Sequence, residues 1–114
     1  MDEISIGALT HVAELKNGQV TRYTITPEQF GFNLANISEL AVTSAKESLK
    51  LIQSVLDNQS GPARDIVCLN AGAAIYAADL VNSLEEGIKK AAEVIADGSA
   101  KAKLEGLVQL SNSL

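Results

Sequence analysis

The chain has 114 residues, of which 46% are hydrophobic, and its formal net charge at pH 7 is −5. This length is that of one domain, and the hydrophobic share excludes a wholly disordered chain. The acidic balance argues against a nucleic-acid partner, whose phosphates need clustered Lys and Arg. The single cysteine, Cys68, excludes a disulfide within the chain and favours a reducing, cytoplasmic location.

The sequence shows neither a secretory signal nor a membrane span. Met1 is followed by two acids instead of a basic segment. The longest apolar stretch, residues 66–81, is interrupted by Asn70 and Asp79. It is also shorter than the ~20 residues that a bilayer crossing needs. We therefore expect a soluble protein with no membrane partner.

Residues 1–32 have the pattern of an extended segment that contains a β-hairpin. Residues 11–16 and 19–25 flank Asn17-Gly18, a pair typical of two-residue hairpin turns because both positions need a positive φ. Residues 26–29 then look like a helix start, with Pro27 in the first turn. The remaining residues, 33–114, are helical in character.

Two helix starts carry the three-residue spacing of a capping box, in which a Ser hydroxyl and a Glu carboxylate each accept from a free main-chain amide. The pairs are Ser44 with Glu47, and Ser83 with Glu86. Each start is followed by apolar residues at helical spacing, which predict one buried stripe per helix. These stripes are Ala45, Leu49, Ile52 and Leu56, and then Leu84, Ile88, Ala91 and Ile95.

Between these two helices, residues 62–80 predict a helix that is apolar on almost every side and must be covered by neighbours. Asn70 is an amide within it, and we expect its hydrogen bonds to be satisfied in the core or across a helix interface. A last helix is expected over about residues 100–110, with Leu104, Leu107 and Val108 facing inward. The order predicts a hairpin followed by four to five helices, as one α+β unit or as part of a larger α/β domain.

Few residues could carry chemistry. His11 is the only histidine, so a zinc site of several histidines is excluded, and we expect a structural or exposed role for it. Cys68 lies in an apolar helix, where cysteine behaves as a small hydrophobe. Asp2 and Glu3 are adjacent carboxylates, the ligand type that Mg²⁺ prefers, although acids near a terminus are most often simply solvated. These patterns alone assign no catalytic or substrate-binding residue.

Several segments nevertheless match a known pattern in order and spacing. The longest is Gly61–Tyr76, and the others are Asp2–Ser5, Val12–Leu15 with Asn17-Gly18, Tyr23–Glu28 with Phe30-Gly31, and Ser83–Gly87. Together they resemble the C-terminal portion of the large domain of the anthranilate phosphoribosyltransferase family. The resemblance spans nearly all of residues 1–114, so it is more specific than any single motif.

This resemblance implies a fold and an activity. The fold would be part of the α/β catalytic domain of nucleoside phosphorylases and phosphoribosyltransferases. Family members transfer the phosphoribosyl group of phosphoribosyl pyrophosphate to anthranilate in tryptophan biosynthesis, and they dimerise through a small N-terminal helical domain. Asp2 and Glu3 match the family's Mg²⁺-binding pair, which would neutralise charge on the leaving pyrophosphate.

The chain also departs from the family. The Gly-rich pyrophosphate loop, the Lys-His-Gly-Asn segment and the anthranilate-binding Arg have no counterpart here, and the small domain is absent. Residues 41–44 replace a Gly-Gly-Asp segment that many members carry. We therefore expect the 114-residue chain alone to be inactive.

Two alternatives remain open. One is a related superfamily member, such as a pyrimidine nucleoside phosphorylase or a nucleic-acid-binding paralogue, the latter disfavoured by the acidic charge. The other is a non-catalytic helical interaction module, in which the apolar helix at residues 66–80 would need a partner.

Overall fold

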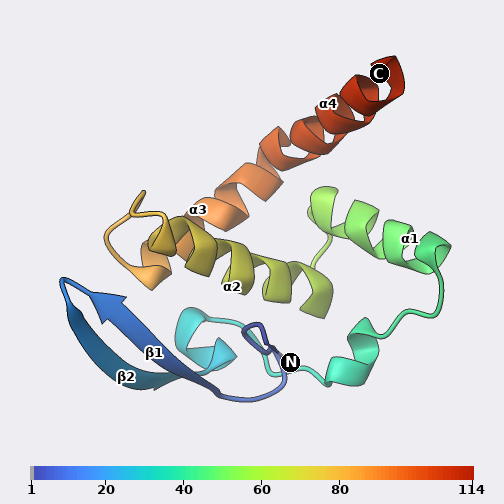
Figure 1. Ribbon diagram of the computed structural model, residues 1–114. Helices are drawn as coiled ribbons and strands as arrows, with labels where there is room; N and C mark the ends of the chain where they lie inside the picture. Colours follow the sequence, from blue (N-terminus) through green and yellow to red (C-terminus); the bar gives the residue numbers. More distant parts are fainter. Residues whose placement is uncertain (1) are drawn as a thin grey trace.

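The computed structural model describes residues 2–114 and shows a β-hairpin followed by helices (Figure 1). Strand β1 (Thr10–Lys16) pairs antiparallel with β2 (Gln19–Ile25) over their full lengths. Asn17 and Gly18 form the turn with φ values of 52° and 77°, as a two-residue hairpin turn requires. The predicted hairpin is confirmed, with β1 starting one residue earlier than expected.

Two short 3-10 helices and four α-helices follow the hairpin. They are η1 (Pro27–Phe30), η2 (Ile37–Leu40), α1 (Ala45–Leu56), α2 (Pro62–Ala77), α3 (Leu84–Ala96) and α4 (Ser99–Ser113). The expected order, a hairpin and then four to five helices, is confirmed. Helix α4 is longer than predicted at both ends.

Helix α2 ends three residues before the predicted limit at Leu80. Asp79 takes a left-handed conformation with φ 62°, and its N–H donates to the Tyr76 carbonyl. The N–H of Leu80 then reaches back to the Ile75 carbonyl at 3.3 Å. This pair of bonds is the Schellman motif, which closes a helix by satisfying its last carbonyls. A left-handed Asp79 therefore ends the helix although the apolar pattern continues.

Both predicted N-caps form, with one difference from the expected capping box. The Ser83 hydroxyl accepts from the Glu86 N–H at 3.1 Å, as the Ser44 hydroxyl does from Glu47. The Glu86 carboxylate, however, accepts from the N–H of Asn82, one residue before the cap. The Glu47 carboxylate likewise accepts from Thr43. Each glutamate thus fixes the chain that enters the helix instead of the cap residue itself.

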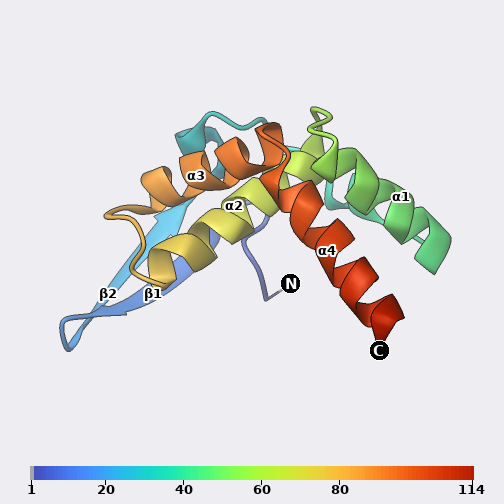
Figure 2. The ribbon, with the colours of Figure 1, turned by 90° about the horizontal axis from the view of Figure 1, so that it is seen from above.

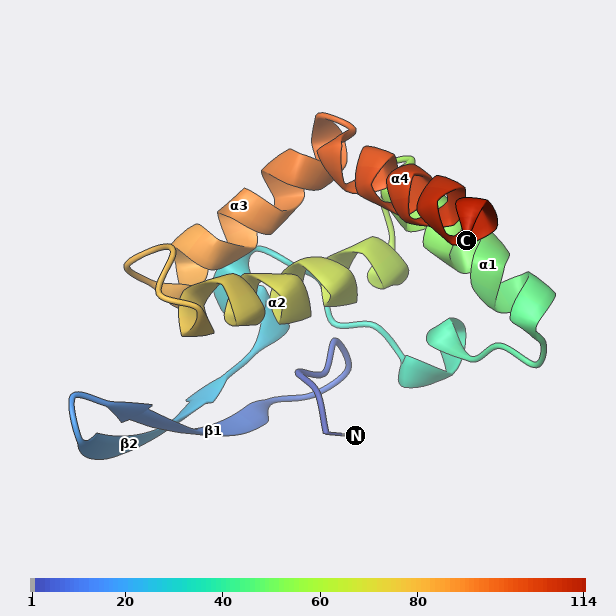
Figure 3. The ribbon, with the colours of Figure 1, turned by 45° about the horizontal axis from the view of Figure 1, so that its top comes forward.

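The core lies where α2 packs against α3; in Figure 3 the two helices are close near the loop that joins them and spread apart from there. Its buried members come from α1, α2, α3 and the segment before β1: Ile6, Val55, Cys68, Leu69, Ile88 and Ile95. The crossing is close because Gly72 faces Gly87 and Ile88 with no side chain between the backbones. The predicted stripe of α3 is confirmed, since Ile88, Ala91 and Ile95 are all buried.

Two other predictions, of a buried apolar face on α1 and on α4, are wrong for the described residues. In α1, Leu49 and Ile52 are 50% and 47% exposed, and the buried residue is Val55, outside the predicted stripe. In α4, Leu107 and Val108 are 62% and 50% exposed. Helix α4 extends away from the other elements (Figures 1 and 2), so most of its length meets no neighbour within residues 2–114.

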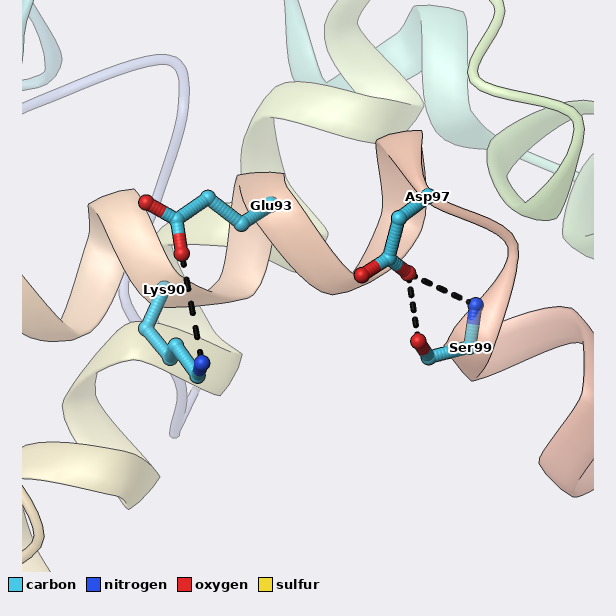
Figure 4. Close-up of polar contacts among 4 residues, drawn as sticks. All are labelled: Lys90, Glu93, Asp97 and Ser99. Atoms are coloured by element: carbon cyan, nitrogen blue, oxygen red, sulfur yellow. Dashed lines mark hydrogen bonds and ion pairs between the residues drawn. The ribbon is translucent and has the colours of Figure 1, made fainter.

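The turn between α3 and α4 is held by local polar contacts (Figure 4). Asp97 ends α3, and its carboxylate accepts from the Ser99 N–H at 2.8 Å and from the Ser99 hydroxyl. These bonds lower the pKa of Asp97. Lys90 and Glu93 form an exposed ion pair at 3.9 Å one turn earlier. Such contacts shape the turn without building a site.

None of the helices in residues 2–114 is long and apolar enough to span a bilayer.

Candidate functional site

The acidic pair lies at the start of the described chain, where both side chains are exposed. The backbone that follows runs quickly into the core. Ile4 is half-buried, and Ile6 is completely buried in the main cluster. Asp2 and Glu3 therefore project from a segment that is anchored only a few residues away.

Asn70 of α2 provides that segment's main polar anchor. Its Oδ1 accepts from the N–H of Ile4 at 2.8 Å, and its Nδ2 donates to the carbonyl of Ile4 at 2.9 Å. The second Nδ2 proton goes to the Ile66 carbonyl, one turn earlier in α2, at 3.0 Å. The prediction of a satisfied amide is confirmed, but the partner is the extended chain beside Glu3 instead of another helix.

Further contacts fix the chain between Ile4 and β1. The N–H of Ser5 donates to the Thr10 hydroxyl oxygen at 3.2 Å, and the Ser5 hydroxyl oxygen accepts from the Gly7 N–H at 3.0 Å. The carbonyl of Ile6 accepts from the Ala35 N–H at 3.1 Å. A Cβ on Gly7 would lie 2.7 Å from the Ala35 carbonyl oxygen, so this close approach requires glycine.

The donor set fits a magnesium ion that shares its shell with a substrate. Mg²⁺ typically takes one or two protein carboxylates and completes its octahedron with water and phosphate oxygens. Asp2 and Glu3 supply two adjacent carboxylates open to solvent. Within residues 2–114, no group of three or more His, Cys, Asp or Glu side chains gathers to form a closed metal site. Two exposed carboxylates leave room for water or a bound ligand to complete such a shell.

A second polar cluster joins the hairpin to α2. The Glu14 carboxylate accepts from the Tyr23 hydroxyl at 2.7 Å and from the Tyr76 hydroxyl at 2.6 Å. The ammonium of Lys16 lies 5.5 Å from the centre of the Tyr76 ring, within cation–π range. These residues line an open cavity between the hairpin and α2.

The cluster perturbs its own ionisable groups. The hydrogen bond from Tyr76, followed by that from Tyr23, lowers the pKa of Glu14. Partial burial and the bond to Glu14 raise the pKa of Tyr23 to about 12. Accepting bonds stabilises the carboxylate, and donating them stabilises the neutral phenols. All three groups therefore keep their ordinary charge states at neutral pH, which indicates a structural link and not acid–base catalysis.

Sequence reasoning missed this cluster, although half of it was predictable. With a two-residue turn, Glu14 pairs with Thr21 and Val12 pairs with Tyr23. Glu14 and Tyr23 are then diagonal neighbours on one face of the hairpin, within reach of long side chains. The third member, Tyr76, lies 62 residues from Glu14 and carried no such signal.

The other candidate residues join neither cluster. His11 is exposed on β1, as predicted. Cys68 is 1% exposed within the core, and burial raises the pKa of its thiol, so it behaves as the predicted small hydrophobe.

A groove between α1, α2 and η2 is lined entirely by apolar side chains, among them Leu51, Ile66 and Val67. Without polar groups it offers no catalytic chemistry.

Comparison with known proteins identifies the family. The sequence profile described as "Glycosyl transferase family, a/b domain" matches residues 1–101. The chain belongs to this family. The match confirms the resemblance that the sequence motifs indicated and places the hairpin and helices within an α/β fold.

Relatives within this glycosyl transferase family carry a more specific name. An anthranilate phosphoribosyltransferase from Methylococcus capsulatus is 67% identical over 97% of this chain. One from Laribacter hongkongensis is 52% identical over the whole of this chain. The crystal structure of anthranilate phosphoribosyltransferase from Thermus thermophilus superposes with a TM-score of 0.85 over 96% of this chain, at 36% identity. The chain spans about a third of the length of each: 33%, 33% and 32%.

Proposed function

We propose that this chain forms one third of an anthranilate phosphoribosyltransferase, within the large α/β domain of that enzyme. The observation that carries the proposal is the 67% identity to the Methylococcus capsulatus protein of that name, sustained over 111 residues. The fold supports it, because the hairpin and four helices match the Thermus thermophilus enzyme at a TM-score of 0.85. The substrates would be phosphoribosyl pyrophosphate and anthranilate.

In this proposal Asp2 and Glu3 hold Mg²⁺. When bound, the ion would neutralise charge on the pyrophosphate leaving group and so lower the barrier to breaking its bond to ribose. The two carboxylates would supply oxygen ligands, and the remaining positions would be left to water and phosphate. The exposure of both residues supports this role, since a buried carboxylate pair would have no room for a shared substrate.

The remaining chemistry would come from residues outside this chain. Neither the Glu14 cluster nor the apolar groove between α1 and α2 offers a nucleophile, a base or a pyrophosphate cradle. The proposal also includes a cytoplasmic location, supported by the free, buried thiol of Cys68. It further includes a homodimer built by a domain that residues 2–114 do not contain.

The test is a chimeric enzyme in which this chain replaces the matching third of the Methylococcus capsulatus relative. We expect the chimera to consume anthranilate in the presence of phosphoribosyl pyrophosphate and Mg²⁺, at a rate within about tenfold of the parent. High identity favours a well-packed junction. A folded chimera that forms no product, while the parent does, contradicts the proposal.

The same chimera separates the proposal from a nucleoside phosphorylase. Phosphorolysis of uridine or thymidine by a chimera that leaves anthranilate unchanged would assign the chain to that class. The relatives support the transferase, since the Methylococcus, Laribacter and Thermus proteins all carry the anthranilate phosphoribosyltransferase name.

A further inference from the structure

We propose that Asn70 is a positioning residue for the acidic pair. Its side-chain amide pairs with the backbone of Ile4 as a neighbouring β-strand would, and so fixes the backbone direction of residues 2–4. This inference rests on the proposed function, because it concerns the aim of the two carboxylates toward Mg²⁺.

The geometry is that of two paired peptide groups. A side-chain amide carries a donor and an acceptor on one planar group, as a peptide does. Asn70 uses both toward a single residue, with 2.8 Å to the N–H of Ile4 and 2.9 Å to its carbonyl oxygen. Two antiparallel strands exchange the same pair of bonds between directly opposed residues. Ile4 is therefore held as if it lay in a sheet.

A third bond fixes the orientation of the amide itself. The other Nδ2 proton is donated to the Ile66 carbonyl at 3.0 Å, four residues earlier in α2. This bond selects one rotamer and one of the two flip orientations of the amide. The Oδ1 acceptor then faces the Ile4 N–H, and the Nδ2 donor faces the Ile4 carbonyl. Both amide protons and the carbonyl oxygen of Asn70 are then used.

This clamp is the last polar anchor before the acids. Within residues 2–114, the N–H and the carbonyl of Ile4 both bond to Asn70. The next fixed points are the Ser5 N–H on Thr10 and the buried Ile6. Without the amide, the backbone before Ser5 would lose this restraint, and the direction of residues 2–4, which carries both carboxylates, would no longer be fixed.

The role is separable from core packing. Asn70 is only partly buried, whereas its neighbours Cys68, Leu69 and Gly72 supply the packed face of α2. Loss of the amide should therefore affect metal binding more than folding. Partners that orient metal ligands without touching the metal typically change affinity by 10–100-fold when they are removed.

The test uses the chimeric enzyme with Asn70→Leu and Asn70→Asp. Leucine has a similar size and makes no hydrogen bond, whereas aspartate keeps an acceptor for the Ile4 N–H and opposes two carbonyl oxygens. The first readout is Mn²⁺ affinity in the presence of phosphoribosyl pyrophosphate, measured by electron paramagnetic resonance. We expect it to fall about 10-fold or more in both variants.

Two further readouts separate positioning from general damage. The KM for Mg²⁺–phosphoribosyl pyrophosphate should rise while the KM for anthranilate stays unchanged. Amide exchange should accelerate at Ile4 but not at Ala35, whose N–H bonds to Ile6. The matched control is Cys68→Ala, in the same helix and with no bond to residues 2–5, which should lower Tm but keep the parental Mn²⁺ affinity.

Unchanged Mn²⁺ affinity in a folded Asn70 variant overturns the inference. If Asn70→Leu does not fold, Asn70→Asp decides alone, because it preserves side-chain shape. Failure of the proposed function has a different signature, since the unsubstituted chimera itself would then lack transferase activity.

Discussion

The hydroxyl of Tyr76, near the end of α2, donates a 2.6 Å hydrogen bond to the carboxylate of Glu14 in β1. The same carboxylate accepts from Tyr23 in β2 at 2.7 Å. One side chain therefore binds both strands of the hairpin to the helix that also holds Ile4. Helix α2 thus orients the hairpin through Tyr76 and the acidic segment through Asn70.

Removal of the Tyr76 hydroxyl should loosen the hairpin without unfolding the helices. We expect Tyr76→Phe to lower Tm by a few degrees and to increase amide exchange in β1 and β2, because the exposed hairpin has few other contacts with α2. Exchange measured residue by residue would check this. Tyr23→Phe is the control, since it removes a bond within the hairpin and leaves the link to α2. Equal effects of the two variants on hairpin docking would contradict the role given to Tyr76.

The cluster of Glu14, Tyr23 and Tyr76 predicts that the fold loses stability at acid pH. The pKa of Glu14 is lowered in the folded chain, so its contribution to stability is fully present above the unfolded pKa of about 4.3. It is lost as the pH falls through the lower, folded pKa. Glu14→Gln should make stability less dependent on pH below about 4. Urea unfolding at several pH values, compared between the two proteins, is the measurement, and parallel curves would count against the prediction.

The tyrosines predict that the fold also loses stability at alkaline pH. The pKa of Tyr23 is raised to about 12, so the neutral phenol stabilises the fold below the ordinary pKa of about 10. This contribution is lost as the pH rises toward 12. Tyr23 and Tyr76 are the only tyrosines of the 114-residue chain, which has no Trp, so the tyrosinate absorbance reports on this cluster alone. Glu14→Gln should shift that absorbance curve to lower pH.

The crossing of α2 and α3 predicts a large effect from one methyl group. A Cβ on Gly72 would lie 2.5 Å from the main-chain nitrogen and Cα of Ile88, atoms that cannot move without separating the helices. We expect Gly72→Ala to destabilise the fold by about 1–3 kcal/mol or more. Gly106→Ala, in the open interior of α4, is the matched control and should instead stabilise by roughly 0.5–1 kcal/mol. Denaturant unfolding of both variants checks the contrast.

The acidic pair predicts a change in metal dependence. In the chimeric enzyme, Asp2→Ala or Glu3→Ala should raise the Mg²⁺ concentration needed for half-maximal activity by about tenfold or more, because one of two carboxylate ligands is lost. Glu105→Ala, at an exposed position of α4, is the control for a general loss of negative charge. An unchanged Mg²⁺ requirement in both site variants would refute the ligand assignment.

The 114-residue chain by itself should form no product from phosphoribosyl pyrophosphate and anthranilate. The two carboxylates are present, but the sequence has no counterpart of the Gly-rich pyrophosphate loop that the family resemblance implies. An assay of the purified chain, with the chimera as positive control, checks this. Turnover by the chain alone would contradict it.

Local rules in the sequence determined the elements. Asn17-Gly18 fixed the turn and the register of the hairpin, because few other pairs take positive φ at both positions. Ser44 and Ser83 set the starts of α1 and α3, since their hydroxyls satisfy free amides within one turn. The motifs shared with the family, Asp2-Glu3 among them, could also be recognised from the sequence alone.

Tertiary structure decided which faces are covered and which distant groups meet. Apolar spacing in α4 predicted a buried stripe, but burial depends on what lies opposite, and Leu107 stays 62% exposed in the described chain. Asn70 and Ile4 are 66 residues apart, and Tyr76 and Glu14 are 62 apart. Contacts at such separation leave no periodic trace in the sequence, because they arise from how α2 packs against the rest of the fold. The acidic pair was therefore visible from the sequence, and only the fold revealed the amide that holds it in place.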